Sequence, residues 1–77
     1  MESEKRFPIQ TPFITLGSFL KLVDAVGSGG EAKIRIQDGE VTVNGEVDRR
    51  RGRKLYPGDR VTLDGVNYRV MSGDLRE

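Results

Sequence analysis

The first hydrophobic pattern in the chain begins after residue 12 and has the period of a helix. Its apolar positions recur at spacings of three and four residues, as on one face of an amphipathic helix. These positions are Leu16, Phe19, Leu20, Val23 and Val26. Thr15 can cap the start of such a helix, and Gly27 can end it. The pattern therefore predicts a first helix over about residues 15–26.

The next stretch fits two local patterns. Ser28 is followed three residues later by Glu31, which is a capping-box signature, and Gly39 suits a helix C-terminus; both favour a short second helix. Apolar residues also alternate around Asp38-Gly39, as they would in a β-hairpin. They are Ile34, Ile36, Val41 and Val43. Local signals favour the helix, and we predict one between Ser28 and Gly39.

The rest of the chain has the pattern of β-structure. Asn44-Gly45 is typical of a tight hairpin turn, and the pairs Pro57-Gly58 and Asp64-Gly65 indicate two further turns. After the Pro-Gly turn, apolar and polar positions alternate with the period of a strand. The apolar positions are Val61, Leu63, Val66, Tyr68 and Val70. We expect them to form one face of a sheet that the two helices cover.

Together these elements predict a small single domain of the α+β class, with two N-terminal helices packed on a short, mainly antiparallel β-sheet. We expect this domain to span residues 13–71. Residues 1–12 mix charges with two prolines and show no period, so a mobile N-terminal segment is expected there. Within it, Phe7 and Ile9 are the candidates for contact with the core. Residues 72–77 are expected to form a C-terminal tail.

Composition limits the chemistry of the chain. A domain of 77 residues has one thin core and little room for a deep catalytic cavity. It contains neither Cys nor His, which excludes thiol nucleophiles, imidazole acid–base catalysis, disulfides and most zinc sites. Two carboxylate pairs, Asp38 with Glu40 and Asp59 with Asp64, are explained by turn formation. We therefore expect no enzymatic activity, no cofactor and no bound metal.

Charge is concentrated in residues 49–54, which we call the basic segment. Its cationic residues are Arg49, Arg50, Arg51, Arg53 and Lys54. They contribute +5, whereas the rest of the chain has 8 Lys and Arg against 12 Asp and Glu, a balance of −4. Such a lopsided distribution attracts a polyanion to one place and orients it. Arginine also forms paired hydrogen bonds with phosphate oxygens, which favours recognition of a polyanion over simple solubilisation.

The order of these features resembles a known RNA-binding domain. A helix, a capped second helix, "GEVTVNGE", a basic segment and "LYPGDRV" follow one another as in the domain named after the fourth small-subunit ribosomal protein, also called the αL motif. Within that superfamily, "SGGEAK" and "DGEVTVNGEVDRRRGRKLYPGDRV" most closely resemble the stand-alone bacterial YaaA/YbcJ-type proteins. The resemblance runs from about Phe13 to Val70, and it also supports a second helix over the alternative hairpin.

The resemblance implies that the second helix and the following turn present basic residues to structured RNA. Lys33 lies where the family commonly has a basic residue. Many relatives have a Ser-Arg pair at the start of this helix, whereas this chain has Ser28-Gly29-Gly30 and places its cations in the basic segment. The two glycines can leave backbone N–H groups open to a phosphate, or they can simply form a flexible turn.

The candidate RNA-binding residues lie on the second helix and in the basic segment. They are Lys33, Arg35, Arg49, Arg50, Arg51, Arg53 and Lys54. Few aromatic side chains are available for base stacking. Tyr56, beside Lys54, is the one candidate, and packing under the Pro57 turn is the preferred interpretation of it. We therefore predict recognition of RNA shape and backbone.

These features predict a non-catalytic, monomeric RNA-binding protein in the cytoplasm, since no apolar run is long enough to cross a membrane. The expected partners are structured RNA, ribosomal RNA first and tRNA second, and ribosome-assembly particles. The alternative is a protein-interaction module or β-grasp-like carrier that binds an acidic protein. Such carriers need a C-terminal Gly-Gly, whereas the chain has only Gly29-Gly30. Replacing Arg49, Arg50, Arg51 and Arg53 with Ala is expected to weaken RNA binding and spare the fold.

Overall fold

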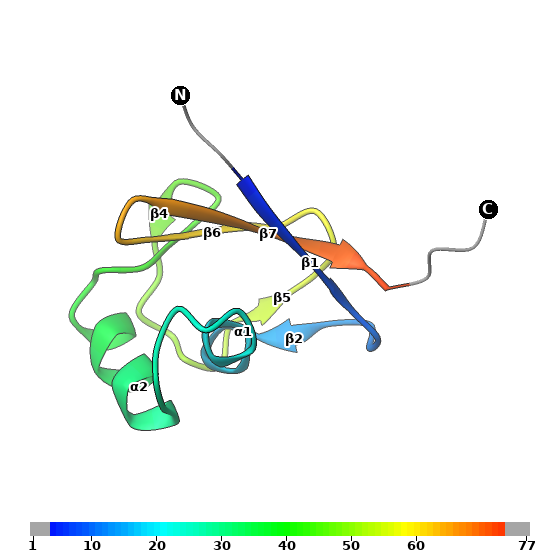
Figure 1. The fold of residues 1–77 in the computed structure, drawn as a ribbon. Coiled ribbons are helices and arrows are strands. Elements are labelled where there is room, and N and C mark those ends of the chain that lie inside the picture. Colours follow the sequence, from blue (N-terminus) through cyan, green and yellow to red (C-terminus); the bar gives the residue numbers. More distant parts are fainter. Residues whose placement is uncertain (1–3, 74–77) are drawn as a thin grey trace.

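The chain enters the fold through a strand. In the computed structural model, which describes residues 4–73, the first element is β1 (Glu4–Ile9). It pairs in parallel with the last element, β7 (Val66–Ser72), so the first and last strands of the described chain lie side by side (Figure 1). The ring of Phe7 on β1 meets Phe19 edge-on, with 6.4 Å between the ring centroids.

This strand corrects the mobile segment that was expected for residues 1–12. Between residues 4 and 9 the backbone is paired, and Ile9 is buried in the core. The partner strand comes from the opposite end of the chain, so no local pattern could indicate the pairing. The expectations for residues 1–3 and 74–77 lie outside the described residues.

The main sheet has five strands in the order β1-β7-β6-β3-β4. Only β1 and β7 are parallel, which confirms the mainly antiparallel sheet. Its other strands are β3 (Thr42–Val43), β4 (Glu46–Val47) and β6 (Arg60–Leu63). A separate antiparallel pair joins β2 (Ile14–Thr15) to β5 (Lys54–Leu55). Because β1 and β2 precede both helices, the helices are not N-terminal as predicted.

The two helices are α1 (Leu16–Leu22) and α2 (Gly29–Gln37). The first ends earlier than the predicted residue 26, because Asp24 takes a left-handed backbone conformation with φ 62°. The second begins as predicted: the Glu31 amide donates to Ser28 Oγ at 3.1 Å. A helix therefore forms where the alternative interpretation had one strand of a hairpin.

The tight turns follow from their sequences. Asn44 and Gly45 both have positive φ, 53° and 89°, as the favoured two-residue hairpin turn requires. Asp64 and Gly65 repeat this geometry between β6 and β7, with φ 55° and 78°. The predicted hairpin at Asn44-Gly45 and the predicted turn at Asp64-Gly65 are both confirmed.

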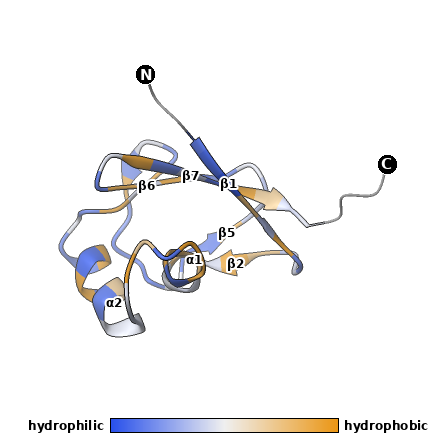
Figure 2. Ribbon diagram, in the orientation of Figure 1, coloured by the Kyte–Doolittle hydropathy of each residue, from blue (hydrophilic) through white to orange (hydrophobic). Residues whose placement is uncertain are grey.

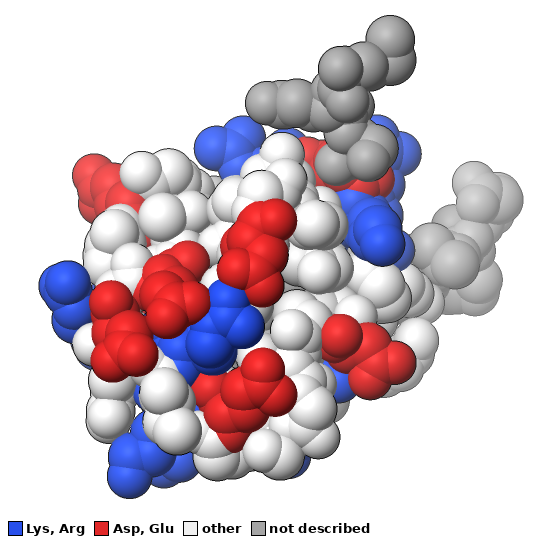
Figure 3. All heavy atoms as spheres, turned by 60° about the vertical axis from the view of Figure 1, so that its left-hand side comes forward, with Lys and Arg blue, Asp and Glu red and all other residues white. Residues whose placement is uncertain are grey.

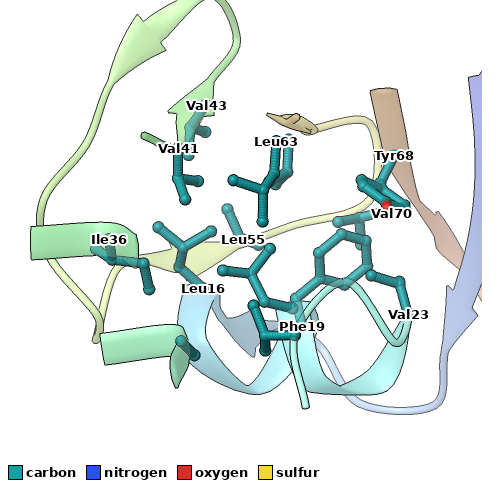
Figure 4. Packing of buried hydrophobic residues seen from close by; sticks show 14 of the residues in the cluster. Leu16, Phe19, Val23, Ile36, Val41, Val43, Leu55, Leu63, Tyr68 and Val70 are labelled. Atoms are coloured by element: carbon teal, nitrogen blue, oxygen red, sulfur yellow. The ribbon is translucent and has the colours of Figure 1, made fainter. Parts of the chain in front are cut away.

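The core lies between the helices and one face of the main sheet. Side chains from α1 and α2 point toward those of the strands, and the sets meet in one cluster (Figure 4). Phe19 and Ile36 from the helices and Val70 from β7 are fully buried. In α2, hydrophilic and hydrophobic residues alternate along the ribbon (Figure 2), so one side of this helix faces the core and the other faces solvent. Neither helix in residues 4–73 has the length and apolarity to cross a membrane.

Candidate RNA-binding surface

The basic segment closes over the start of α1. Thr15 stands at the predicted N-cap position, but its side chain forms no cap hydrogen bond. Instead the Leu16 amide donates to the Arg53 carbonyl at 2.8 Å, and the Gly17 amide donates to the Arg51 carbonyl at 3.0 Å. The backbone of the basic segment thus satisfies the first free amides of the helix.

Side-chain packing tightens this connection. A Cβ at Gly17 would lie 2.7 Å from Cγ of Arg51, closer than side-chain carbons approach in folded proteins. Only glycine lets the Arg51 side chain lie this close to α1. The position of the basic segment is therefore fixed by contacts with the helix as well as by its own sequence.

Two of its arginines are held by a buried carboxylate. Asp48 is 7% exposed. Its Oδ1 accepts hydrogen bonds from Nε and the backbone amide of Arg50, at 2.9 and 3.0 Å, and its Oδ2 accepts from Arg50 Nη2 at 2.8 Å and from Arg53 Nη1. These bonds, chiefly the side-chain bonds from Arg50, hold the pKa of Asp48 far below its usual range. Arg50 and Arg53 thus bind this carboxylate and fix the loop.

Arg35 is surrounded by carboxylates. They belong to Glu31, Glu40 and Asp64, whose oxygens lie 3.7, 2.5 and 2.5 Å from the guanidinium. The hydrogen bond with Glu40 is the main cause that raises the pKa of Arg35. On the face that carries α2, acidic side chains lie directly beside basic ones (Figure 3). Arg35 therefore belongs to a locally acidic cluster, although it was predicted to extend a basic surface.

The other predicted contact residues are exposed and form no ion pair within residues 4–73. They are Lys33, Arg49, Arg51 and Lys54. Arg49 lies against the end of α2, where a Cβ at Gly39 would be 2.7 Å from its guanidinium. Lys54 places Nζ 4.9 Å from the centroid of the Phe13 ring. Of the seven predicted residues, four thus keep a charge that no carboxylate of the described chain neutralises.

A cleft of about 340 Å³ lies between α1, the start of α2 and the basic segment. Lys21 and Ser18 line it from α1, Arg51 from the basic segment and Gly29 from α2. Lys21 lies close to the start of α2, since a Cβ at Gly29 would be 3.9 Å from its Nζ. The side chains of Lys21 and Arg51 and a helix N-terminus, which carries a partial positive charge, therefore line one hollow.

The cap of α2 leaves part of its first turn available. The Glu31 amide donates to Ser28 Oγ, and the Glu31 carboxylate accepts from the Gly27 amide at 2.8 Å. Neither bond uses the amides of Gly29 and Gly30, which come first in the helix. Lys33 lies one turn after Gly29 and so on the same side of α2.

Sequence reasoning missed two residues of this cleft, Ser18 and Lys21. Both occupy polar positions between the apolar residues of the predicted first helix, and the sequence analysis did not single them out. Their importance depends on the loop that closes over α1, and the helix sequence contains no signal of that loop.

Comparison with known proteins agrees with the geometry. The family model described as the S4 domain matches residues 7–71. A relative from Bacillus subtilis (strain 168), named "Probable ribosome maturation protein RlbA", is 58% identical over 57 residues, which cover 74% of this chain and 80% of the relative. "Putative RNA-binding protein YbcJ" from Escherichia coli (strain K12) is 36% identical over 61 residues, covering 79% of this chain and 87% of the relative. The resemblance to the αL RNA-binding domain is confirmed, and the chain belongs to the S4 domain family.

Proposed function

We propose that this protein is a non-catalytic RNA-binding protein that acts on ribosomal RNA or on a ribosome-assembly particle. Its family and the names of its two relatives support this class of function. The cleft between α1, α2 and the basic segment carries the proposed mechanism, because Lys21 and Arg51 meet there beside the first turn of α2.

In this mechanism an RNA phosphate enters the cleft. The planar guanidinium of Arg51 forms paired hydrogen bonds with the phosphate oxygens, and Lys21 adds a mobile positive charge. The amides of Gly29 and Gly30 are available as further donors at the positive end of the helix. No step requires bond making or breaking in the RNA.

The surface continues on both sides of the cleft. Lys33 extends it along α2, Arg49 extends it toward the end of that helix, and Lys54 extends it along β5. We call Lys21, Lys33, Arg49, Arg51 and Lys54 the outer cations. Contact with four to six phosphates would make log affinity fall with log salt at a slope of roughly −3 to −5.

Three of the seven predicted RNA-binding residues are bound by carboxylates and have a different proposed role. Arg50 and Arg53 position the basic segment through Asp48. Arg35 ties the end of α2 to the turn between β6 and β7 through Asp64. Their effect on RNA binding is therefore indirect.

One chain supplies every group of this surface, so the proposed complex needs only a monomer. Backbone contacts recognise the shape of a folded RNA more than its sequence. The name of the Bacillus subtilis relative favours ribosomal RNA as the proposed ligand, with tRNA as the nearest competitor and the cytoplasm as the site of action.

Fluorescence anisotropy tests the proposal. Wild-type protein is titrated with a structured ribosomal RNA fragment, a tRNA and a DNA duplex over a range of salt concentrations. Arg49→Gln/Arg51→Gln removes two outer cations, and Lys5→Gln/Arg6→Gln removes two exposed cations from β1 as a charge-matched control. We expect the first variant to lose about tenfold in affinity per arginine and the salt slope to become shallower by about 2. The control should bind as wild type does.

Equal loss in both variants, or equal binding of all three nucleic acids, would contradict the proposal and leave only a general attraction for polyanions. The fourfold Ala variant of the basic segment is less suitable than it appeared from the sequence. It removes both arginines from Asp48 and would leave a buried carboxylate without its partners.

A further inference from the structure

We propose that Phe13 and Tyr56, together with Lys54, form a platform on which an unpaired RNA base stacks. This inference rests on the proposed RNA-binding function and adds to it a site with a distinct ligand chemistry. It also revises the expectation that Tyr56 packs under the Pro57 turn, because 49% of Tyr56 is exposed.

The two rings form a pair at the surface of the domain. Phe13 is 36% exposed, and the ring centroids of Phe13 and Tyr56 are 5.9 Å apart with an interplanar angle of 50°. Because the rings are tilted, neither face of one ring is fully covered by the other. Lys54 lies over Phe13, so the more exposed surface for a planar ligand is that of Tyr56.

The short β2–β5 pair sets this arrangement. Ile14 is opposite Leu55, and Leu55 is fully buried. Since successive side chains of a strand point to opposite faces, the residue before Ile14 and the residue after Leu55 turn outward together. The two aromatic residues therefore meet outside the domain because their neighbours meet inside it.

Hydrogen bonds fix the backbone on both sides. Thr11 Oγ1 donates to the Phe13 carbonyl at 2.6 Å. The Tyr56 amide donates to Asp59 Oδ2 at 2.7 Å, and the Asp59 amide donates to the Tyr56 carbonyl at 2.9 Å. A platform held in this way is ordered before its ligand arrives, which lowers the entropic cost of binding.

Charge favours a nucleic acid as the occupant. Lys54 belongs to the basic segment, and its partner in the strand pair, Thr15, lines the cleft proposed to hold phosphate. Phe13 lies two residues before Thr15, about 7 Å along an extended chain. One RNA strand can therefore place a phosphate in the cleft and a neighbouring base on Tyr56. An apolar protein segment would gain nothing from the Lys54 ammonium group beside the rings.

The test uses an RNA hairpin with a single bulged 2-aminopurine, a base whose fluorescence is quenched by stacking. A second hairpin carries the same base paired within the stem. Wild type is compared with Tyr56→Phe, which keeps the aromatic face, and with Tyr56→Leu, which keeps apolar bulk without it. Stacking predicts quenching of the bulged base by wild type and Tyr56→Phe only. It also predicts a roughly tenfold loss of affinity for the bulged hairpin in Tyr56→Leu, with affinity for the paired hairpin unchanged.

Three results would overturn the platform, and they are distinguishable. If all three proteins bind the bulged hairpin equally and quench it equally, RNA binding stands but stacking on Tyr56 is wrong. If Tyr56→Phe loses as much affinity and quenching as Tyr56→Leu, the hydroxyl matters and the aromatic face does not. If wild type binds neither hairpin, the proposed function fails along with the platform. Retained binding of the paired hairpin by Tyr56→Leu shows that this variant is folded.

Discussion

Two clusters of arginine and carboxylate groups in this protein have net charges of opposite sign. Around Asp48, one carboxylate is shared by Arg50 and Arg53. Around Arg35, one guanidinium faces three carboxylates. The first cluster therefore keeps a positive charge and the second a negative one. The difference teaches that contacts made by the fold, and not position in a basic run of sequence, determine which arginines are paired with carboxylates.

The clusters also differ in burial. Asp48 is almost completely buried, whereas the carboxylates around Arg35 have 42 to 63% of their side-chain surface exposed. Ion pairs in solvent contribute little to stability, with typical values of about 0 to 1 kcal/mol. Only the Asp48 cluster is expected to determine the stability of its loop.

The largest expected effect is that of Asp48→Ala. It removes the acceptor of four hydrogen bonds in a buried position, and we expect the free energy of unfolding to fall by about 2 kcal/mol. Urea denaturation measures this change. Glu46→Ala, which removes an exposed carboxylate from β4, is the matched control and should change stability by less than about 0.5 kcal/mol. Equal effects of the two substitutions would show that the buried Asp48 carboxylate stabilises the fold no more than an exposed carboxylate does.

The contribution of Asp48 to folding stability should decrease at acid pH. In the folded protein the pKa of Asp48 is lowered below its ordinary value of 3.8. Its contribution to the free energy of unfolding is therefore complete above pH 3.8 and is lost as the pH falls toward the folded pKa. The stability difference between wild type and Asp48→Asn should therefore shrink between about pH 5 and about pH 2. Urea denaturation across this range measures it. A difference that stays constant over the range would show that the carboxylate charge is not what holds the loop.

Gly39→Ala tests the contact between the basic segment and the end of α2. Gly39 has φ 78°, and a Cβ there would lie 2.7 Å from the Arg49 guanidinium. We expect a loss of about 1 kcal/mol in stability and weaker RNA binding, since Arg49 must move. Thermal unfolding and anisotropy measure the two effects. Gly52→Ala is the control, because no heavy atom lies within 4 Å of its added Cβ. If both variants have the same stability and affinity, the contact between Arg49 and Gly39 has no role.

The smallest expected effect comes from removing the excess of negative charge around Arg35. Glu40→Gln/Asp64→Asn removes two exposed carboxylates, which frees the guanidinium and makes the α2 face less acidic. We expect stability to change by less than about 1 kcal/mol and RNA affinity to rise about two- to fivefold at low salt. Unchanged or weaker binding in anisotropy titrations would mean that this face does not repel RNA.

Local sequence signals were enough to predict much of the fold. Ser28 and Glu31 form the predicted cap of α2, and Asn44-Gly45 forms the predicted hairpin turn. In each case the chemistry acts over two to four residues, so the sequence contains it. The pairing of β1 with β7 could not be predicted in this way, because it joins the two ends of the described chain.

The candidate site shows the same division between local and distant effects. The sequence located a dense cationic segment, and RNA binding by its residues stays a prediction. It did not indicate that Asp64 reaches Arg35 from 29 residues away, or that the Arg51 side chain packs on Gly17 and lines a cleft with Lys21. Whether a cationic side chain is paired with a carboxylate or lines the cleft depends on these distant contacts, which only the folded structure contains.

In the proposed mechanism the outer cations, and not the carboxylate-bound arginines, supply the affinity for RNA. Arg51→Gln and Arg35→Gln remove the same charge from the two kinds of position, so salt titrations of both variants on one ribosomal RNA fragment separate the two roles. We predict that Arg51→Gln weakens binding about tenfold and makes the salt slope shallower by about 1, while Arg35→Gln leaves both nearly unchanged. Equal losses in the two variants would contradict the claim, because net charge alone would then determine the affinity.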